Sequence, residues 1–411
     1  MRIATVSWTR RIVGGAETTM ALSLGTLARA GHRLAMWCET DRPTDRPILP
    51  LPEGPIWCAE TMGPERALAA LRDWKPDLLY VHGLLDPATE RQLLTVAPGV
   101  FFAHAYYGTC ISGNKTLTFP RTRPCPHTFG WPCLLRYYPR RTGGLSPVTM
   151  LREYRRQAQR LRRLRDYRYI VVLSEHMRTE YVKHGLDPAR VVRLPFPARR
   201  AGRGSAPSPD FTARPRQPSD PWQLLFVGRM DPLKGGAALL AAAPLAAQSL
   251  RTPIRVTLVG DGPARRRWET LAAKLCTPRA GATASFTGWL SEAEVHAWYR
   301  AAHLLVVPSL WPEPFGKAGL EAAAFGVPAT AFAVGGIPEW LTDGVNGTLA
   351  PGDPPTPQGL AEATVRALRD PAGYQTLCRG ALALGRATDE DRHGAAVLSV
   401  LERAAGAAAP A

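Results

Sequence analysis

The sequence has few lysines and few acidic residues for its size, and it has no long apolar run. Only six of its 51 basic residues are Lys, and its 34 Asp and Glu leave a net charge of +17. Such a charge suits nucleic acid, anionic lipid or an anionic small substrate, and charge alone does not choose between them. The apolar stretch 236–247 is interrupted by Pro244 and is too short and too rich in Ala to span a bilayer.

Cysteine is also sparse and irregularly spaced. Seven cysteines, an odd number, favour reduced thiols over a disulfide framework. The first residues run directly into a strand-like segment, without a charged leader and an apolar core, so we expect no signal peptide. We therefore expect a cytoplasmic protein, which can also be peripheral at the inner face of the membrane.

The length and the apolar pattern predict two α/β domains. The 411 residues exceed one ordinary core, and an apolar fraction of 45% favours a globular protein. In both halves short apolar runs alternate with amphipathic segments, which is typical of parallel strands joined by crossover helices. We predict two Rossmann-like parallel-sheet domains that face each other across a cleft. The predicted boundaries are an N-terminal domain over 1–197, a linker over 198–221, a C-terminal domain over 222–385 and a final helical segment over 386–411.

The predicted strands place the candidate site. In the first half we expect strands at 3–8, 33–38, 78–82, 100–104, 169–174 and 191–194. In the second half we expect them at 223–228, 255–260, 284–288, 304–308 and 328–333. Open α/β sheets bind ligands at the carboxyl ends of their strands, so the residues that follow each strand are the candidates.

Residues 308–336 combine two carboxylates with a helix start. Glu313 and Glu321 lie on either side of a helix that we expect to open near Phe315-Gly316. A helix N-terminus favours a phosphate, and carboxylates beside it suit hydroxyl groups, so the pattern indicates a pocket for a sugar nucleotide. In the alternative, Glu313 is a first-turn partner of the helix dipole and Glu321 is a solvated helix residue. That alternative explains either residue, but not the pair with its Gly-rich turns.

A second motif supplies positive charge after the strand at 223–228. Arg229 and Lys234 lie five residues apart around an Asp-Pro turn, before a Gly-Gly pair at a helix start. Arg offers a bidentate fork to phosphate and Lys a compact charge, so both suit a diphosphate whose negative charge grows as a glycosidic bond breaks. The alternative is two surface cations in a loop. Further Gly-rich turns at 260–263 and 335–336 follow strands of the same predicted sheet.

The first half offers weaker signals. Gly14 and Gly15 follow the first strand, where glycine lets the backbone approach a phosphate or sugar, but they lack the full dinucleotide fingerprint and are equally explained as ordinary loop glycines. His104 closes the strand at 100–104 and can hold a hydroxyl or phosphate or act as a base. A lone histidine at a strand end is more often structural.

Residues 106–144 break the α/β pattern. They contain Cys110, Cys125, His127 and Cys133, which are enough donors for a structural zinc site. The spacing lacks the tight C-x2-C pair that is typical of such sites, so the favoured interpretation is a set of ordinary cysteines in a loop that shapes an acceptor pocket.

Residues 151–168 form an expected helix whose polar face is almost entirely Arg. A stripe of Leu, Tyr and Ala at three- and four-residue spacing gives it one apolar side. The helix can lie on anionic lipid, or it can be a solvated face on a packed helix. The arginines are Arg152, Arg155, Arg156, Arg160, Arg162, Arg163, Arg165 and Arg168.

Taken in chain order, these motifs resemble those of the retaining GT-B glycosyltransferases of family 4, which carry a Glu-x7-Glu signature. The matching segments are residues 14–17, 104, 227–235, 260–263, 313–321 and 335–339. The resemblance implies the GT-B fold, a final helix that returns to the first domain, and a UDP-, GDP- or ADP-sugar as co-substrate. It implies no required metal or other cofactor, and it suggests a place in cell envelope or glycoconjugate biosynthesis.

The resemblance also implies roles for the matching residues. Arg229 and Lys234 would hold the donor diphosphate, Glu321 the ribose, and Glu313 and His104 the transferred sugar. The residues assigned to catalysis are Arg229, Lys234, Glu313 and His104. Those assigned to donor binding are Gly14, Gly15, Gly228, Gly262, Pro314, Phe315, Gly316, Lys317 and Glu321. The sequence departs from the family at Lys317-Ala318, where Val or Leu often follows Phe-Gly.

The resulting hypothesis is a retaining hexosyltransferase that moves a sugar from a nucleotide donor to a lipid-linked, polysaccharide or small-molecule acceptor. Two alternatives stay open. One is a non-catalytic protein that binds sugar nucleotides, polyanions or a membrane surface through its arginines. The other is a GT-B sugar-nucleotide epimerase. We expect no nucleic-acid partner, and the donor base, donor sugar and acceptor stay open.

Overall fold

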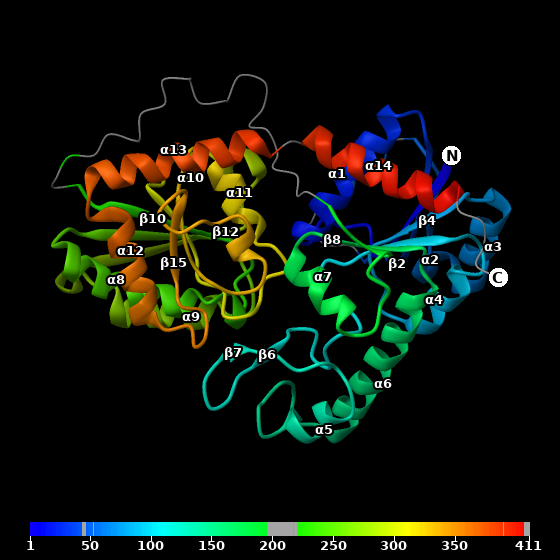
Figure 1. The fold of residues 1–411 in the computed structure, drawn as a ribbon, viewed down its shortest axis with the longest axis horizontal. Coiled ribbons are helices and arrows are strands. Elements are labelled where there is room, and N and C mark those ends of the chain that lie inside the picture. Colours follow the sequence, from blue (N-terminus) through cyan, green and yellow to red (C-terminus); the bar gives the residue numbers. More distant parts are fainter. Residues whose placement is uncertain (43–46, 52, 195–216, 218–219, 389, 407–411) are drawn as a thin grey trace. The chain divides into compact units, whose positions relative to one another are not determined.

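The chain forms two compact units in a computed structural model that describes residues 1–42, 47–51, 53–194, 217, 220–388 and 390–406. Unit 1 comprises Met1–Lys115, Pro126–Pro197 and Glu390–Ala411, and unit 2 comprises Thr116–Cys125 and Ala198–Asp389. Figure 1 shows the elements of both units.

Unit 1 is built on a seven-stranded parallel sheet. Its strand order is β3-β2-β1-β4-β5-β8-β9, so the order reverses between β1 and β4. The strands are β1 (Arg2–Thr9), β2 (Arg33–Thr40), β3 (Ile56–Cys58), β4 (Leu78–Val81), β5 (Gly99–Phe102), β8 (Tyr169–Val172) and β9 (Val191–Arg193). β4 and β5 are buried along their whole length, as expected for strands covered by helices on both faces.

Helices cover both faces of this sheet (Figure 1). The helices of unit 1 are α1 (Gly15–Arg29), α2 (Ala59–Met62), α3 (Pro64–Trp74), α4 (Pro87–Leu93), α5 (Pro132–Tyr137), α6 (Pro147–Arg163), η1 (Leu164–Asp166), α7 (Glu175–Val182) and α14 (Glu390–Gly406). Of these, α5 lies away from the sheet and packs on α6. The last helix, α14, packs beside α1 and buries Val397, Val400 and Leu401. The end of the chain is therefore part of unit 1.

Unit 2 repeats the architecture with a six-stranded parallel sheet of order β12-β11-β10-β13-β14-β15. The order reverses between β10 and β13. The strands are β10 (Trp222–Val227), β11 (Ile254–Val259), β12 (Ala282–Gly288), β13 (Leu304–Val307), β14 (Ala329–Phe332) and β15 (Gly347–Ala350). A separate antiparallel pair, β6 (Thr116–Leu117) and β7 (Arg123–Pro124), also belongs to this unit.

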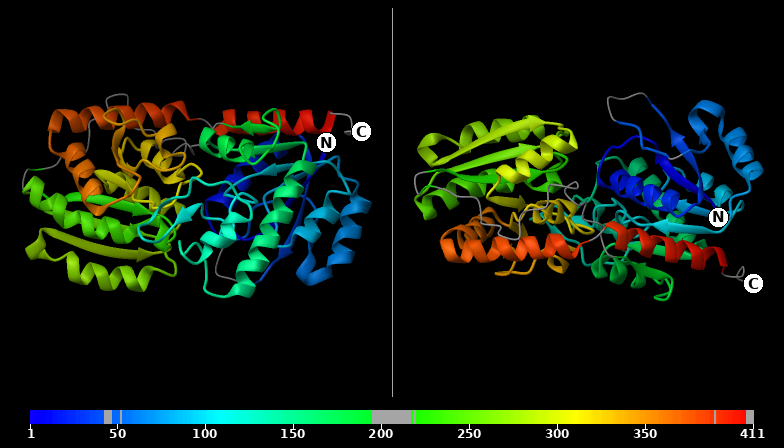
Figure 2. Two further views of the ribbon diagram at one scale, coloured as in Figure 1. Left: turned by 60° about the horizontal axis from the view of Figure 1, so that its bottom comes forward. Right: turned by 90° about the horizontal axis from the view of Figure 1, so that it is seen from above.

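The helices of unit 2 again lie on both faces of the sheet, with α11 and α13 on one side and α8, α9 and α12 on the other (Figures 1 and 2). They are η2 (Pro232–Lys234), α8 (Gly236–Leu250), α9 (Arg265–Leu275), η3 (Pro278–Ala280), α10 (Glu292–Ala301), α11 (Lys317–Ala323), η4 (Ile337–Glu339), α12 (Pro357–Leu368) and α13 (Pro371–Ala387). Trp268 of α9 is 1% exposed and meets Phe226 of β10 edge-on, with ring centroids 5.6 Å apart.

The predicted fold class, two Rossmann-like parallel sheets, is confirmed. Every strand that the apolar runs predicted is present, within two residues at either end. The sequence did not predict the short strands β3 and β15, because each carries too few apolar residues to show a period. Nearly all of the predicted linker, 198–221, lies outside the described residues.

Two further findings concern cysteines and membranes. The seven cysteines all lie within the described residues and are free thiols. Among the helices that the structure describes, none combines the length and apolar character needed to cross a bilayer.

Candidate active site

Two loops meet where the strand order of unit 2 reverses, one after β10 and one after β13. Leu310 N–H donates to the Leu233 carbonyl at 2.8 Å and joins them. Gly235 has a φ of 74°, and a Cβ at this position would lie 1.7 Å from the carbonyl oxygen of Pro308. Only glycine permits so close an approach in this backbone conformation. The contact places Lys234 beside the loop that carries Glu313.

Lys234 and Glu313 form an ion pair, with Nζ 2.7 Å from Oε1. The Glu313 side chain is 6% exposed and that of Lys234 is 32% exposed. Ser309 Oγ and Trp311 Nε1 donate to the same carboxylate oxygen at 2.5 and 2.9 Å. Three donors therefore fix the Glu313 carboxylate at the carboxyl end of β13. The structure brings these two sequence-predicted residues together.

A third loop, after β14, supports Glu313 from its backbone side. Gly336 N–H donates to the Glu313 carbonyl at 2.8 Å. Gly335 has a φ of 60°, and a Cβ there would lie 2.2 Å from that same carbonyl oxygen. The Gly-Gly pair, which sequence reasoning placed at this edge, thus serves a close backbone contact beside Glu313.

The close approach at Gly235 predicts a large effect of an added methyl group. We expect Gly235→Ala to lower the free energy of unfolding by at least about 3 kcal/mol, because the methyl group clashes with fixed backbone and the φ is strained. The matched control is Gly344→Ala, since Gly344 has a φ of 75° but open space around it. The control should cost about 1 kcal/mol. Equal losses in urea unfolding would contradict this account of the loop contact.

Arg229 lies in the same loop as Lys234 but in a different environment. Its side chain is exposed, and no ion pair joins its guanidinium to a residue that the structure describes. The neighbouring backbone is well held, because Met230 N–H donates to the Asp261 carbonyl at 2.8 Å and Ala264 N–H to the Met230 carbonyl at 2.9 Å. These bonds join the turns that contain Gly228 and Gly262. An exposed arginine on a fixed turn is available to an anion.

Helix α11 begins at Lys317, with Gly316 in the left-handed conformation as its N-cap, so the expected helix start is confirmed. The helix has seven residues. Lys317 Nζ lies 3.1 Å from Glu321 Oε1, and Tyr299 Oη donates to Glu321 Oε2 at 3.0 Å. Burial and the Glu321 carboxylate raise the pKa of Tyr299 well above its usual value, so it stays a donor. The charge of Lys317 is thus shared with Glu321.

Pro314 and Phe315 lie between the two carboxylates. The Phe315 carbonyl accepts a hydrogen bond from Trp340 Nε1 at 2.7 Å; Pro314 is buried and Phe315 is half-buried. This contact fixes the backbone just before α11. The peptide groups that were predicted to face a phosphate therefore have a defined conformation.

In unit 1, Gly14 and Gly15 form the start of α1 after β1. Gly14 is the N-cap, and its N–H donates to the Glu17 carboxylate at 2.8 Å, whereas Gly15 is exposed. Burial raises the pKa of Glu17, and its hydrogen bonds oppose that rise. One glycine therefore has a capping role, and only Gly15 is presented to solvent.

His104 follows β5, at the carboxyl edge of the sheet as expected. Its Nε2 lies 2.8 Å from Nδ1 of His82, which follows β4, and the two rings stack. Burial and the neighbouring His393 lower the pKa of His104 to about 3, and burial with His104 lowers the pKa of His82 well below its usual value. Both rings are therefore neutral near pH 7. A neutral His104 can bond a hydroxyl group but brings no positive charge to a phosphate.

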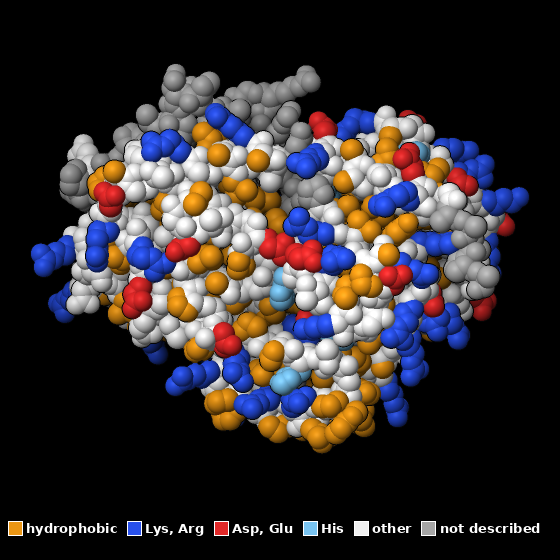
Figure 3. Space-filling model, viewed as in Figure 1, with side chains coloured by type: hydrophobic (Ala, Val, Ile, Leu, Met, Phe, Trp, Pro, Cys, Tyr) orange, Lys and Arg blue, Asp and Glu red, His pale blue; other side chains and the backbone are white. Residues whose placement is uncertain are grey.

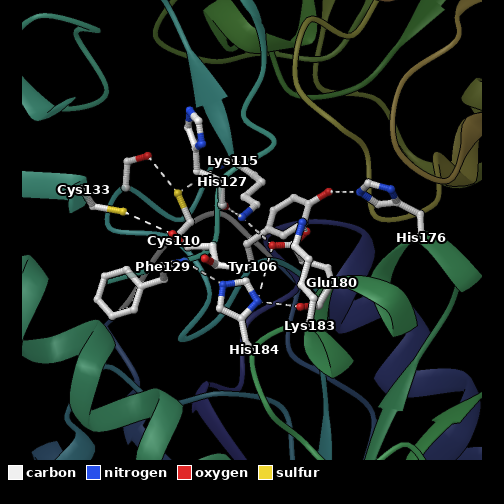
Figure 4. Close-up of polar contacts among 12 residues, drawn as sticks. Tyr106, Cys110, Lys115, His127, Phe129, Cys133, His176, Glu180, Lys183 and His184 are labelled. Atoms are coloured by element: carbon white, nitrogen blue, oxygen red, sulfur yellow. Dashed lines mark hydrogen bonds and ion pairs between the residues drawn. The ribbon is translucent and has the colours of Figure 1, made fainter. Parts of the chain in front are cut away.

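The candidate zinc ligands of residues 106–144 are not assembled. Among the described residues, no group of three or more His, Cys, Asp or Glu is placed to hold a metal ion. Cys110 Sγ instead accepts from Lys115 N–H at 3.3 Å, and the Lys115 ammonium group donates to the His127 carbonyl (Figure 4). Burial raises the pKa of the Cys133 thiol. The Lys115 ammonium group also pairs with the buried Glu180 carboxylate, so this carboxylate already has a cation.

The Arg-rich helix also differs from the prediction. α6 begins at Pro147 and ends at Arg163, and one of its arginines points inward. Arg160 is 7% exposed, donates to the Leu84 carbonyl at 2.7 Å and lies 4.2 Å from the Tyr107 ring centroid. The sequence places Arg160 on the polar face of this helix, whereas the structure buries its side chain, which helps to hold α6 onto unit 1.

Sequence reasoning missed several side chains at these sites. Ser309 and Trp311 lie within four residues of Glu313, so a search for donors around that carboxylate would have found them. Tyr299 and His82 are 22 residues from the partners that they bond, Glu321 and His104. Only the three-dimensional fold relates them.

Two family models match the chain. The model described as Glycosyltransferase Family 4 matches residues 13–197, and the model described as Glycosyl transferases group 1 matches residues 221–370. The chain belongs to glycosyltransferase family 4. Solved structures similar to this family 4 chain include sucrose-phosphate synthase from Thermosynechococcus elongatus, with 22% identity, a TM-score of 0.68 and 98% of each chain covered. Anabaena HepE in complex with UDP has 18% identity and a TM-score of 0.65, over 98% of this chain and 100% of that chain.

These structural likenesses show the GT-B fold. Curated relatives of this family 4 chain include the D-inositol 3-phosphate glycosyltransferase of a Nocardioides species, 37% identical over 48% of this chain and 45% of the relative. The protein of the same name from Thermomonospora curvata is 34% identical over 52% of each. The chain thus spans about half the length of the curated relatives that it matches.

Proposed function

We propose that the chain is a retaining, metal-independent glycosyltransferase that moves a hexose-type sugar from a nucleoside diphosphate sugar to an acceptor hydroxyl. The observation that carries this proposal is the Lys234–Glu313 ion pair at the switch point of unit 2, with the exposed Arg229 on the adjoining turn. Crystal structures of the structural neighbour HepE hold UDP or UDP-glucose, which supports this donor class.

In the proposed reaction, the bond between the anomeric carbon and the donor phosphate oxygen breaks, and its electron pair passes to the diphosphate. Lys234 and Arg229 stabilise the charge that develops there. The acceptor oxygen bonds to the anomeric carbon on the same face, and its proton passes to the leaving phosphate. No protein nucleophile is required in this scheme.

The carboxylates and His104 position the donor in this proposal. Glu313, fixed by three donors, bonds hydroxyls of the transferred sugar, and Glu321 bonds the ribose. The ion pair of Glu321 with Lys317 would open or tilt when the ribose binds, since both groups are part-exposed. A neutral His104 accepts from or donates to a sugar hydroxyl without attracting the diphosphate.

The acceptor is proposed only as a class. The curated relatives are named for D-inositol 3-phosphate, and solved neighbours include a lipopolysaccharide outer core galactosyltransferase. A small polyol phosphate and a lipid-linked glycan are therefore the first acceptors to test. A peripheral location at an anionic membrane is part of the proposal for the second of these.

The proposed function predicts selective stabilisation by one donor class. In a thermal unfolding panel of UDP-, GDP- and ADP-sugars with EDTA present, we expect one nucleotide series to raise the melting temperature by about 5 °C at 100 times its Kd. Mass spectrometry of acceptor mixtures should then show a mass increase of one hexose. Donor conversion without any acceptor would indicate an epimerase, and binding without turnover would indicate a non-catalytic protein.

A further inference from the structure

Exposed apolar side chains are concentrated in one short stretch of unit 1. Of the 13 large hydrophobic residues that are exposed among the described residues, six lie between positions 131 and 151. They are Trp131 (67% exposed), Leu135 (66%), Tyr138 (39%), Leu145 (87%), Val148 (74%) and Leu151 (44%). Figure 3 shows hydrophobic side chains gathered at the lower end of the molecule, where Figure 1 places α5 and the start of α6. We call these six residues the apolar tip.

The apolar tip follows from helix periodicity. Trp131, Leu135 and Tyr138 are four and three residues apart, so they share one face along α5 and its ends. Val148 and Leu151 are three residues apart on the first turns of α6, and Leu145 directly precedes that helix. α5 and α6 pack against each other. Along α5 and on the first turn of α6, the exposed side of the helix and not only its packed side carries large apolar side chains, which is unusual for a surface that faces water.

The charge around the apolar tip is predominantly positive. Residues 131–156 contain six Arg and one acidic residue, Glu153. Arg152 and Arg155 are exposed on α6 and follow Leu151 by one and four residues. With a rise of about 1.5 Å per residue, Arg155 lies roughly 10 Å along the helix from Val148. That spacing matches an apolar end buried about 5–10 Å in the boundary between headgroups and acyl chains, with cations at the level of the phosphates.

The apolar tip rests on a buried polar network that fixes its position (Figure 4). Lys115 Nζ lies 2.5 Å from Glu180 Oε1, and both side chains are 3% exposed. Phe129 N–H donates to His184 Nε2 at 2.8 Å, which ties the segment before α5 to the end of α7. The Phe129 ring also packs on Tyr154 of α6, with centroids 5.2 Å apart. The exposed apolar residues therefore belong to an anchored structure.

We propose that the apolar tip and its arginines dock unit 1 onto an anionic lipid bilayer. The apolar side chains enter the boundary of the acyl region, and Arg152 and Arg155 bind lipid phosphates, each basic residue adding to the attraction near an anionic surface. The contact lies at the α5–α6 corner and not along the whole of the predicted Arg-rich helix. At this membrane surface the docked enzyme would meet a lipid-linked acceptor; this part of the inference rests on the proposed function.

Vesicle sedimentation of the full-length chain, without donor or acceptor, tests the proposal. The wild-type chain should bind vesicles of phosphatidylcholine with phosphatidylglycerol and bind poorly to phosphatidylcholine alone. Leu135→Ser with Val148→Ser should reduce binding to the anionic vesicles at least about tenfold. Arg152→Gln with Arg155→Gln should also weaken it and flatten its dependence on salt.

Matched controls lie elsewhere on the chain. Leu245 and Val345 are exposed by 39% and 53%, so Leu245→Ser with Val345→Ser makes the same two side-chain changes at exposed positions away from the tip and should leave binding unchanged. Arg266→Gln with Arg267→Gln is the corresponding charge control on α9.

Three results would overturn the proposal. The first is failure of the wild-type chain to sediment with anionic vesicles, and the second is equal binding by the tip variant and its control. The third is a tip variant that converts a dimer to a monomer in light scattering while vesicle binding persists, since the tip would then be a contact between two copies. Because no sugar nucleotide is present, each result is independent of donor turnover, which is measured separately with a free acceptor.

Discussion

Replacing Lys234 by Ala is expected to reduce the rate of sugar transfer by about two to three orders of magnitude, without unfolding the chain. In the proposed reaction the ammonium group stabilises the diphosphate as it leaves, and this charge is larger in the transition state than in the bound donor. The variant also leaves the buried Glu313 carboxylate without its cation, although Ser309 and Trp311 still donate to it. The measurement is kcat and the donor KM with the donor identified by the thermal panel.

The control for this variant is Lys274→Ala, which removes an exposed lysine from α9. It should keep wild-type kinetics. We expect the loss in Lys234→Ala mainly in kcat, because the charge of the leaving group grows in the transition state. A double variant with Glu313→Gln should lose less than the sum of the two single losses, since the pair acts as a unit. Wild-type kcat in Lys234→Ala would contradict the assignment of this loop to the leaving group.

Replacing Lys115 by Met is expected to lower the free energy of unfolding by about 3–5 kcal/mol. The Lys115 ammonium group and the Glu180 carboxylate are both 3% exposed and lie 2.5 Å apart. Removal of the cation leaves a buried carboxylate with less compensation, and it also removes the hydrogen bond to the His127 carbonyl that holds the segment before α5. Urea unfolding at neutral pH measures this loss.

The same carboxylate provides the control. Lys183 also pairs with Glu180, but its side chain is 32% exposed, so Lys183→Met should cost at most about 1 kcal/mol. Combining Lys115→Met with Glu180→Gln should recover part of the stability, because no unpaired charge then stays buried. Similar losses of unfolding free energy for Lys115→Met and Lys183→Met would show that burial of the Lys115–Glu180 ion pair does not decide how much it stabilises the fold.

The sequence predicted the sheets well because their strands are buried on both faces. Runs such as those of β4 and β13 are apolar without interruption, and a fully buried strand leaves that pattern in any single sequence. The turns at Gly235 and Gly335 were also visible, because close backbone contacts there require glycine. These two signals together located the carboxyl edge of unit 2 and the loops that carry Lys234 and Glu313.

The sequence could not predict contacts that depend on folding partners far along the chain. The pairing of His82 with His104 arises because β4 and β5 are neighbours in the sheet, and a pattern of apolar residues does not reveal that. In the sequence nothing distinguishes Arg160 from the surface arginines beside it. In the structure its guanidinium lies over the Tyr107 ring and donates to the carbonyls of Leu84 and Leu85, in the loop after β4. The thiols of residues 106–144 suggested zinc, whereas in the fold Cys110 Sγ accepts from the Lys115 backbone N–H and the Lys115 ammonium group donates to the His127 carbonyl.

An NMR measurement of the product tests most directly whether this chain transfers sugar from a nucleotide donor with retention. An α-configured nucleoside diphosphate hexose is incubated with an acceptor that gains mass in the panel, with EDTA present throughout. We expect an α-linked product and one equivalent of free nucleoside diphosphate, with both formed at least about a hundredfold more slowly by Lys234→Ala. A β-linked product, or activity that EDTA abolishes, would contradict this expectation.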